Sequence, residues 1–378
     1  MGDNLDVVVI GAGWAGLSVS RGLQAAGIPH LVLERGRIGE TWRAQRWDSF
    51  HFNIPRVLTV MPGDRYDGSD PEGAMSRDEF VALLEDYAAR HGLPVHPGEA
   101  VIEVTSDATG FYLVRTANRT LGARHIVVAS GSLNRPKRPA LAREISGPAQ
   151  IDASDYRSAA ALGPGSVLVV GSGQSGGQIA RDLIDAGRGV FLSTGRVGRL
   201  PRRYRGRDLT LWLVEGGMLE VPREAFVQPS GAVPARPLQG ATETLSLQSL
   251  SALGVVLLGR LNGADGMVLT FSDDVAENIR FADEASAALR LKVDDYIARA
   301  GIAAPAATDD PAEVVAARLP SPPLTALDLA ARGIGIGTTS GLYFPGLDFA
   351  STRKSGTILA AADETRRIVS HILARLGA

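Results

Sequence analysis

The hydrophobic pattern along the chain predicts short buried strands that alternate with helices. Residues 5–10 (Leu-Asp-Val-Val-Val-Ile) form an apolar run of strand length, and an Ala-rich helical segment follows them. Residues 30–34, 124–128, 165–170 and 189–194 are further short apolar runs. Such runs, separated by helical patterns, are typical of parallel sheets covered by helices. The pattern therefore predicts an α/β fold.

Helix-capping residues and alternating apolar positions predict several other elements. Ser76 and Glu79 have the spacing of a capping box before a helix over residues 80–90. Residues 99–105 and 111–116 alternate and predict two strands. The remaining expected elements are helices over 243–253, 272–299 and 357–376, strands over 255–259, 268–271 and 342–344, and a proline-rich linker over 303–323.

Composition narrows the function classes. The 378 residues are enough for roughly two or three domains of about 150 residues each. Lys plus Arg (39) nearly balances Asp plus Glu (41), which gives no reason to expect nucleic acid as a partner. The chain has no cysteine, so thiolate chemistry, disulfides and Cys-ligated metals are excluded, and no metal site is expected. No apolar run reaches membrane-spanning length and no leader pattern is present, so we expect a cytoplasmic protein with no membrane partner.

The first strand runs into a glycine-rich loop with the G-x-G-x-x-G spacing of a dinucleotide site. The first glycine allows the sharp turn, the second admits a pyrophosphate, and the third lets helix and strand pack closely. Glu34 ends the next strand 23 residues after the first glycine, near the roughly 20 expected for a carboxylate that holds a ribose hydroxyl. The alternative is a glycine-rich turn without a ligand. The candidate loop residues are Gly11, Gly13, Trp14, Ala15 and Gly16.

The same pattern returns after Pro164, with a strand, a glycine-rich loop and a helix. Two copies of one nucleotide-binding unit imply two nucleotides, and a duplication with one inactive site is the alternative. The candidate residues of the second loop are Gly171, Gly173, Gln174, Ser175 and Gly176.

The residue that ends the strand after the second loop differs from Glu34. Thr194 occupies the equivalent position, and arginines follow at 196, 199, 202, 203, 205 and 207. A ribose 2′-phosphate is repelled by a carboxylate and attracted by arginine, so the second site is expected to prefer NADP over NAD. Most of these arginines are expected to form a solvated face or interdomain contacts. The candidate nucleotide-binding residues here are Thr194, Arg196 and Arg203.

With these motifs and four others, the chain resembles the flavin-containing monooxygenase superfamily, a class that includes N-hydroxylating and Baeyer–Villiger enzymes. The four other matching motifs are Gly39-Glu-Thr-Trp42, Asn53-Ile-Pro55, Val128-Ala-Ser-Gly131 and Gly341-Leu-Tyr-Phe-Pro-Gly346. The resemblance implies FAD at the first site and NADPH at the second. It also implies hydride transfer to the flavin, reaction with molecular oxygen, and oxygenation of a small organic substrate by a flavin C4a-hydroperoxide.

The resemblance also implies roles for individual residues. Thr41 and Trp42 would lie along the FAD, and Asn53 would lie beside the flavin ring as the candidate catalytic residue. The alternative for Trp42 and the neighbouring Trp47 is that they anchor their loop on the core. The other residues expected at the FAD are Arg35, Val101, Ala129, Ser130 and Gly131.

Two departures from the family pattern keep a second function open. Asp152 stands where the family has a histidine, and none of the six histidines lies between residues 126 and 370. The segment 332–341, which returns from the second domain, is short. An FAD-dependent enzyme that has lost NADPH-driven oxygenation, such as an oxidase or a non-redox flavin catalyst, is the alternative, and a non-catalytic partner subunit is a third possibility.

The duplicated motifs predict two Rossmann-like domains. Residues 1–155 together with 330–378 are expected to form a discontinuous FAD-binding domain, and residues 156–329 an inserted NADP-binding domain. The substrate and the oligomeric state have no signature in the sequence.

Overall fold

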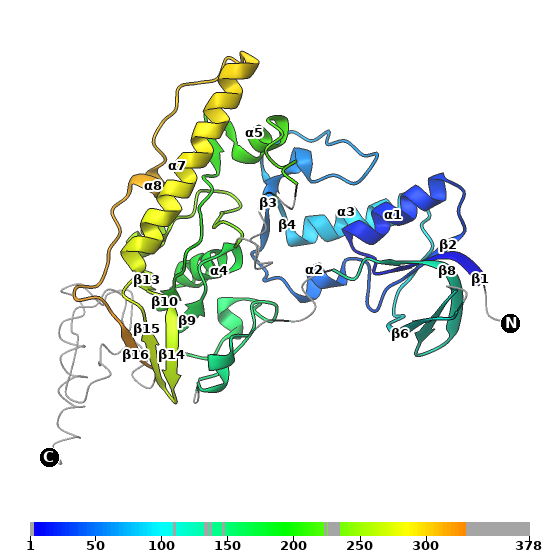
Figure 1. Ribbon diagram of the computed structural model, residues 1–378, viewed down its shortest axis with the longest axis horizontal. Helices are drawn as coiled ribbons and strands as arrows, with labels where there is room; N and C mark the ends of the chain where they lie inside the picture. Colours follow the sequence, from blue (N-terminus) through cyan, green and yellow to red (C-terminus); the bar gives the residue numbers. More distant parts are fainter. Residues whose placement is uncertain are drawn as a thin grey trace. The chain divides into compact units, whose positions relative to one another are not determined.

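The computed structural model describes residues 4–108, 111–131, 136, 138–145, 148–222, 225 and 235–329. Within these ranges the chain divides into two compact units. Unit 1 contains the residues up to 136 together with Asp152–Arg157, and unit 2 contains Arg138–Ile151 and the residues from 158 to 329. Both units contain parallel strands covered by helices, which confirms the predicted α/β fold class (Figure 1).

The elements of unit 1 are β1 (Asn4–Ile10), α1 (Trp14–Ala25), β2 (His30–Leu33), α2 (Glu40–Ala44), β3 (His51–Pro55), a 3₁₀ turn (Arg56–Leu58), β4 (Ala74–Ser76), α3 (Arg77–Arg90), β5 (Val95–His96), β6 (Val101–Ser106), β7 (Tyr112–Thr116) and β8 (Thr120–Val128). Six strands form one sheet in the order β5-β2-β1-β8-β7-β6 (Figure 1). Strands β5, β2, β1 and β8 are parallel, whereas β7 is antiparallel to both of its neighbours. Strands β3 and β4 form a separate antiparallel pair.

The core of unit 1 forms because the central strands are apolar on both faces. Val8 and Val9 alternate along β1 and are both fully buried, each within a different hydrophobic cluster. Helix α3 begins at the expected capping box. The Ser76 hydroxyl accepts a hydrogen bond from the Glu79 N–H at 3.2 Å, and the Glu79 carboxylate accepts one from the Ser76 N–H at 2.8 Å. The two bonds satisfy donors that a helix start leaves open.

The elements of unit 2 are two 3₁₀ turns (Ala140–Arg143 and Ala159–Ala161), β9 (Val167–Val170), α4 (Gln174–Asp185), β10 (Val190–Ser193), β11 (Arg203–Tyr204), β12 (Arg207–Asp208), α5 (Leu209–Glu215), α6 (Leu247–Ala252), β13 (Val256–Leu258), β14 (Leu261–Asp265), β15 (Val268–Phe271), α7 (Val275–Ala300), α8 (Pro311–Val314) and β16 (Ala326–Asp328). Strands β13, β10 and β9 form a parallel sheet, and β14, β15 and β16 form an antiparallel one (Figure 1). Among the described residues, no helix combines the length and the hydropathy needed to cross a membrane.

Several elements differ from the sequence-based expectation. Helix α6 begins at Leu247 rather than at 243, because the Ser246 side chain accepts a hydrogen bond from the Ser249 N–H and caps the helix there. Strand β14 was not expected, since Leu-Asn-Gly-Ala-Asp has no apolar alternation, and it depends on pairing with β15. The expected strand 342–344 and helix 357–376 lie outside the described residues.

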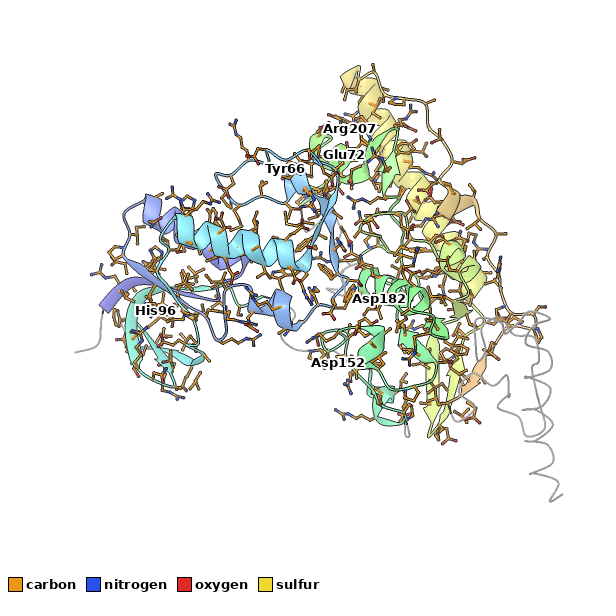
Figure 2. The ribbon with its side chains drawn as sticks, turned by 180° about the vertical axis from the view of Figure 1, so that it is seen from behind. Tyr66, Glu72, His96, Asp152, Asp182 and Arg207 are labelled. Atoms are coloured by element: carbon orange, nitrogen blue, oxygen red, sulfur yellow. The ribbon has the colours of Figure 1, made fainter. Side chains whose placement is uncertain are left out.

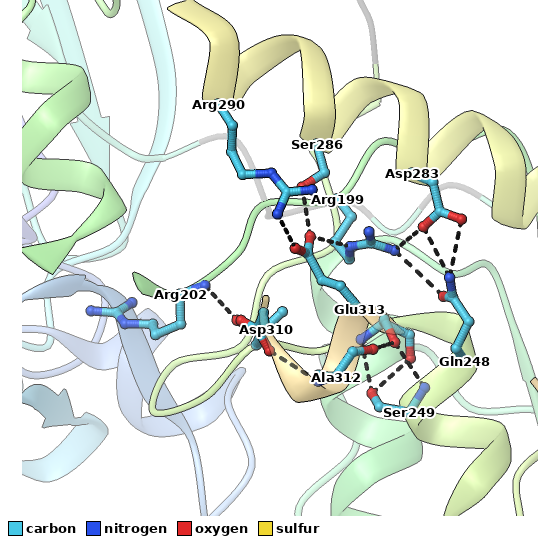
Figure 3. A network of polar contacts seen from close by, with 12 residues as sticks. Arg199, Arg202, Gln248, Ser249, Asp283, Ser286, Arg290, Asp310, Ala312 and Glu313 are labelled. Carbon is cyan, nitrogen blue, oxygen red and sulfur yellow. Dashed lines mark hydrogen bonds and ion pairs between the residues drawn. The ribbon is translucent and has the colours of Figure 1, made fainter. Parts of the chain in front are cut away.

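The expectation of a linker over 303–323 is wrong for its central part. Helix α8 lies within it, and the Glu313 side chain is only 4% exposed. Glu313 pairs with the guanidinium of Arg199 at 2.9 Å, and Asp283 pairs with the same guanidinium at 2.7 Å (Figure 3). Arg199 is 2% exposed, and a buried guanidinium is costly unless carboxylates surround it. The ion pairs therefore hold this segment against unit 2.

We expect Glu313→Gln to lower the free energy of unfolding by about 3–5 kcal/mol, because it leaves the buried Arg199 without one of its two counter-charges. Glu284→Gln is the matched control: Glu284 forms an exposed pair with Arg280 at 3.8 Å, and its loss is expected to cost under about 1 kcal/mol. Urea unfolding followed by circular dichroism measures both. Similar losses for the two variants would show that the Arg199 network does not stabilise unit 2.

Candidate functional site

The first glycine-rich loop has the backbone geometry that a dinucleotide site requires. Gly11 has φ +107°, and a side chain there would bring its Cβ within 2.5 Å of the Ala129 carbonyl oxygen. A Cβ on Gly16 would overlap the carbonyl oxygen of Gly11. Gly13 differs from both, because a Cβ there would meet no atom within 4 Å. The first and third glycines are therefore needed for packing, whereas the second faces open space.

Helix α1 presents its N-terminus at this loop. Gly13 caps the helix in an extended conformation, with no side chain among the described residues bonded at the cap and no acidic residue in the first turn. Trp14 is 51% exposed and Ala15 is also exposed. Open N–H groups and the helix dipole make such an end favourable for an anion.

Glu34 lies against the loop as the spacing predicts. Its carboxylate is 8% exposed and accepts hydrogen bonds from the Ala12 N–H at 2.8 Å and from the Gly36 N–H at 2.9 Å. Each carboxylate oxygen keeps acceptor capacity beyond these bonds, which a ribose hydroxyl needs. Arg35, between Glu34 and Gly36, is exposed.

Val101 is brought beside Glu34 by a backbone contact. The Glu99 N–H donates to the Glu34 carbonyl at 2.7 Å, and Val101 begins β6 two residues later. The Glu99 carboxylate is buried and accepts two hydrogen bonds from Arg119, both at 2.7 Å. The Arg119 bonds hold the pKa of Glu99 below its usual range, with smaller help from the Thr116 hydroxyl. The Glu99–Arg119 pair therefore holds the segment before β6 against the end of β2.

Helix α2 is joined to the glycine-rich loop. The Gly39 N–H donates to the Ala12 carbonyl at 3.1 Å, and Gly39 has φ +70°, so the helix starts directly beside the loop. Thr41 and Trp42 lie on this helix, and both are half-buried. The structure thus brings Thr41 and Trp42 to the same end of the sheet as Glu34.

Aromatic rings surround Trp42. Its ring centroid lies 4.7 Å from that of Phe52 and 5.2 Å from that of Phe80. Trp47 is buried and packs against Tyr156, with 6.3 Å between centroids. These contacts favour the interpretation that both tryptophans anchor their segment, while the half-exposure of Trp42 leaves its expected place along FAD as a prediction.

Other expected residues stand at the ends of strands. Asn53 is half-buried on β3 and takes part in a polar contact. After β8, the Ala129 N–H donates to the Ile10 carbonyl at 2.8 Å, which holds the turn against β1. Ser130 and Gly131 follow and are exposed, and Gly131 has φ +80°.

Asp152, in the position of the family's histidine and labelled in Figure 2, belongs to unit 1 by its contacts. It is half-buried and has a polar partner. The Asp48 N–H donates to the Arg157 carbonyl at 2.8 Å, so the segment Asp152–Arg157 returns to the loop that carries Trp47.

The second glycine-rich loop repeats the geometry of the first. Gly171 has φ +103°, and a Cβ on Gly176 would overlap the Gly171 carbonyl oxygen. A Cβ on Gly173 would meet nothing closer than the Arg236 carbonyl oxygen at 3.7 Å, an ordinary contact. The duplicated motif is therefore a duplicated structure.

Helix α4 begins at Gln174, with Ser175 exposed and no acidic residue in its first turn. A segment that the sequence analysis missed lies beside it. The Gln178 amide donates to the Gln239 carbonyl at 3.0 Å, and the exposed Arg236 precedes this segment. Arg236 stands far along the chain in no motif, so only the folded structure reveals its place next to Gly173.

Thr194 does not point outward. It is 2% exposed, and its hydroxyl donates to the Leu258 carbonyl at 2.8 Å and accepts from the Asn278 amide at 3.1 Å. These bonds connect β10 with β13 and α7. A contact of the Thr194 side chain with a nucleotide stays a prediction.

The arginines after Thr194 divide into two groups. Arg196 is exposed and has no partner among the described residues, and Arg203 is exposed and donates to the Gly206 carbonyl at 2.6 Å. The other four pair with carboxylates of unit 2, in the pairs Arg199–Glu313, Arg202–Asp208, Arg205–Asp294 and Arg207–Glu215 (Arg207 is labelled in Figure 2).

Comparisons with known proteins identify the family of this chain. A family model described as pyridine nucleotide-disulphide oxidoreductase matches residues 8–205. An uncharacterized oxidoreductase, CzcO-like, of Geobacillus kaustophilus is 36% identical over 220 residues, which are 57% of this chain and 62% of that protein. The indole-3-pyruvate monooxygenase YUCCA1 of Oryza sativa subsp. japonica is 35% identical over 205 residues, 53% of this chain and 50% of that protein. The chain thus spans less than two thirds of the length of these relatives.

A solved structure shares the fold. A variant of the flavin monooxygenase from Stenotrophomonas maltophilia aligns over 99% of both chains, with a TM-score of 0.54 and 18% identity. At this identity the likeness concerns the fold alone.

The chain belongs to the pyridine nucleotide-disulphide oxidoreductase family, because the family model spans more than half of it. The match to indole-3-pyruvate monooxygenases supports the resemblance to the flavin-containing monooxygenase superfamily, for which FAD and NADPH are the expected cofactors. The residues fit such cofactors: a Cβ on Gly13 would meet no atom within 4 Å, one on Gly173 would make only an ordinary contact, and neither helix has an acidic residue in its first turn.

We expect Gly13→Ala to fold normally but to lose bound FAD, because its new methyl group meets no protein atom and enters the space left for the pyrophosphate. Gly22→Ala is the control, since Gly22 lies in the same helix and a Cβ there also meets no atom within 4 Å. Circular dichroism reports folding, and the flavin absorbance of the purified protein reports FAD. Full FAD content in Gly13→Ala would show that this space is not the pyrophosphate site.

Proposed function

We propose that this protein is an FAD- and NADPH-dependent monooxygenase that oxygenates a small organic substrate. The observation that carries the proposal is the duplicated glycine-rich loop, with the Glu34 carboxylate at the first copy and the exposed Arg196 near the second. Relatives named as indole-3-pyruvate monooxygenases support the reaction class over the part of the chain they match. We further propose a cytoplasmic location and molecular oxygen as the second substrate.

In this proposal unit 1 binds FAD and unit 2 binds NADPH. Glu34 would accept hydrogen bonds from the FAD ribose, and the N-terminus of α1 would stabilise the pyrophosphate. The N-terminus of α4 would do the same for NADPH, with Arg196 at the 2′-phosphate. The part of the FAD domain expected over residues 330–378 lies outside the described residues.

A bound flavin would supply the redox chemistry, with NADPH as the reductant and molecular oxygen as the oxidant. The protein itself would orient the flavin and the substrate and would exclude water from them. Asn53, half-buried on β3, is proposed to donate a hydrogen bond to the flavin ring from its side-chain amide. Trp42 and its aromatic neighbours would provide a dry wall.

Asp152 favours the second candidate, an FAD-dependent enzyme without NADPH-driven oxygenation. A carboxylate at this position adds negative charge where the family pattern has histidine, and a negatively charged dinucleotide is repelled by it at short range. An oxidase or a non-redox flavin catalyst would keep the unit 1 site and would not depend on the second nucleotide.

We expect Arg196→Gln to raise the Kd for NADPH about tenfold and to leave the Kd for NADH unchanged, because only NADPH carries the 2′-phosphate. Arg207→Gln is the matched control, since Arg207 already pairs with Glu215 at 2.6 Å. Titration of the oxidised holoenzyme with each nucleotide measures the Kd for NADPH and the Kd for NADH of the wild type and of both variants. An equal rise of the Kd for NADPH and the Kd for NADH in Arg196→Gln would contradict the proposed contact between Arg196 and the 2′-phosphate.

We expect NADPH to bleach the absorbance of the bound flavin at about 450 nm under anaerobic conditions, because hydride transfer reduces the oxidised ring. The measurement uses the purified holoenzyme in a stopped-flow instrument, with NADH and candidate substrates as parallel additions. Persistence of the colour with both nucleotides, with and without substrates, would contradict the monooxygenase and favour the second candidate.

A further inference from the structure

Arg46 follows α2 by two residues and lies on the aromatic cluster of unit 1, which consists of Trp42, Phe50, Phe52 and Phe80. Its guanidinium carbon is 4.8 Å from the centroid of Trp42 and 5.4 Å from that of Phe50. Such stacking is attractive for a cation, but only by about 0.5–2 kcal/mol. The side chain is half-buried, so stacking replaces only part of the hydration that the charge loses.

Arg46 has no counter-ion among the described residues. Of its five N–H donors, one bonds to a protein acceptor, the carbonyl of Gln45 at 2.7 Å. Burial lowers the pKa of Arg46. The nearby carboxylates pair with other arginines, as Asp48–Arg77, Asp78–Arg77, Glu85–Arg43, Glu79–Arg56 and Glu40–Arg37.

The adjacent residue adds a second unsatisfied group. The side-chain oxygen of Gln45 is buried, and no described residue donates a hydrogen bond to it. A buried acceptor left without a partner costs about 1–3 kcal/mol. The remaining donors of Arg46 lie over the aromatic rings, which is the arrangement of a polar contact point in an otherwise apolar binding site.

We propose that Arg46 binds an oxyanion, the carboxylate of the organic substrate, at the edge of the aromatic cluster. The planar guanidinium offers two parallel N–H donors to the two carboxylate oxygens, and Trp42 and Phe50 provide the apolar surface for the rest of the molecule. Naming the substrate class in this way rests on the proposed function, whereas binding of the anion does not.

The partner already present for the pyrophosphate favours a substrate carboxylate over an FAD phosphate. The Gly39 N–H bonds to the Ala12 carbonyl of the glycine-rich loop at 3.1 Å, so the start of α2 lies beside the expected pyrophosphate position. Arg46 follows the other end of this five-residue helix, and its guanidinium stacks over Trp42. The pyrophosphate already has the N-terminus of α1 as its partner, so the donors of Arg46 are left for another anion.

The test uses oxidised holoenzyme without NADPH, so its outcome is independent of whether the enzyme turns over. Phenylacetate and phenylacetamide, alike in shape and different in charge, are titrated while flavin absorbance and tryptophan fluorescence are recorded. We expect the wild type to bind the acid about 10- to 100-fold more tightly than the amide. Equal binding of the two probes, or no binding of either, would overturn the proposal without any variant.

Variants then test whether the preference for the charged probe comes from Arg46. Arg46→Gln is expected to lose the preference for phenylacetate and to keep its affinity for phenylacetamide, and Arg46→Lys is expected to retain part of the preference. Arg43→Gln is the control, because Arg43 comes from the same segment and pairs with Glu85. A preference unchanged in Arg46→Gln would overturn the proposal. Loss of FAD affinity with an unchanged preference would instead assign Arg46 to a phosphate of FAD.

Discussion

The contact between the first and third glycines of each loop is the constraint on which both units depend. A Cβ on Gly16 would overlap the Gly11 carbonyl oxygen, and a Cβ on Gly176 would overlap that of Gly171. Because neither position carries a side chain, helices α1 and α4 begin directly on the turn that leaves their strands. The N–H groups of each helix start are thereby held at the carboxyl edge of a parallel sheet, where an anion is stabilised.

The sequence predicted the parts of this arrangement that depend on local spacing. The strand, loop and helix of each copy, the capping box of α3 and the approach of Glu34 to its loop all involve residues that a short motif specifies. Strand β14 and the segment after Arg236 could not be predicted, because pairing and packing with distant residues hold them in place. Helix α8 was missed for the same reason. The prolines indicated a linker, but the ion pair between Glu313 and the buried Arg199 holds this segment in place.

Arginine shows most clearly why a site needs a structure as well as a motif. Arg199 and Arg196 stand three residues apart in the same basic run, yet one is buried between carboxylates and the other is exposed. Arg46 belongs to no basic run and stacks on aromatic rings without a counter-ion among the described residues. The residue type is the same for all three, so burial and partner decide whether a guanidinium supports the fold or remains available to a ligand.

The two nucleotide sites differ most where their second strands end. Glu34 is held by two backbone N–H groups and keeps lone pairs for a further donor, whereas the hydroxyl of Thr194 already bonds to Leu258 and Asn278. A side chain that connects β10 with β13 and α7 cannot turn toward a ribose without breaking those bonds, which would leave buried groups unsatisfied. We therefore expect any discrimination between nucleotides in unit 2 to depend on the exposed side chains that follow Thr194, and Arg196 is the first of them that carries a charge.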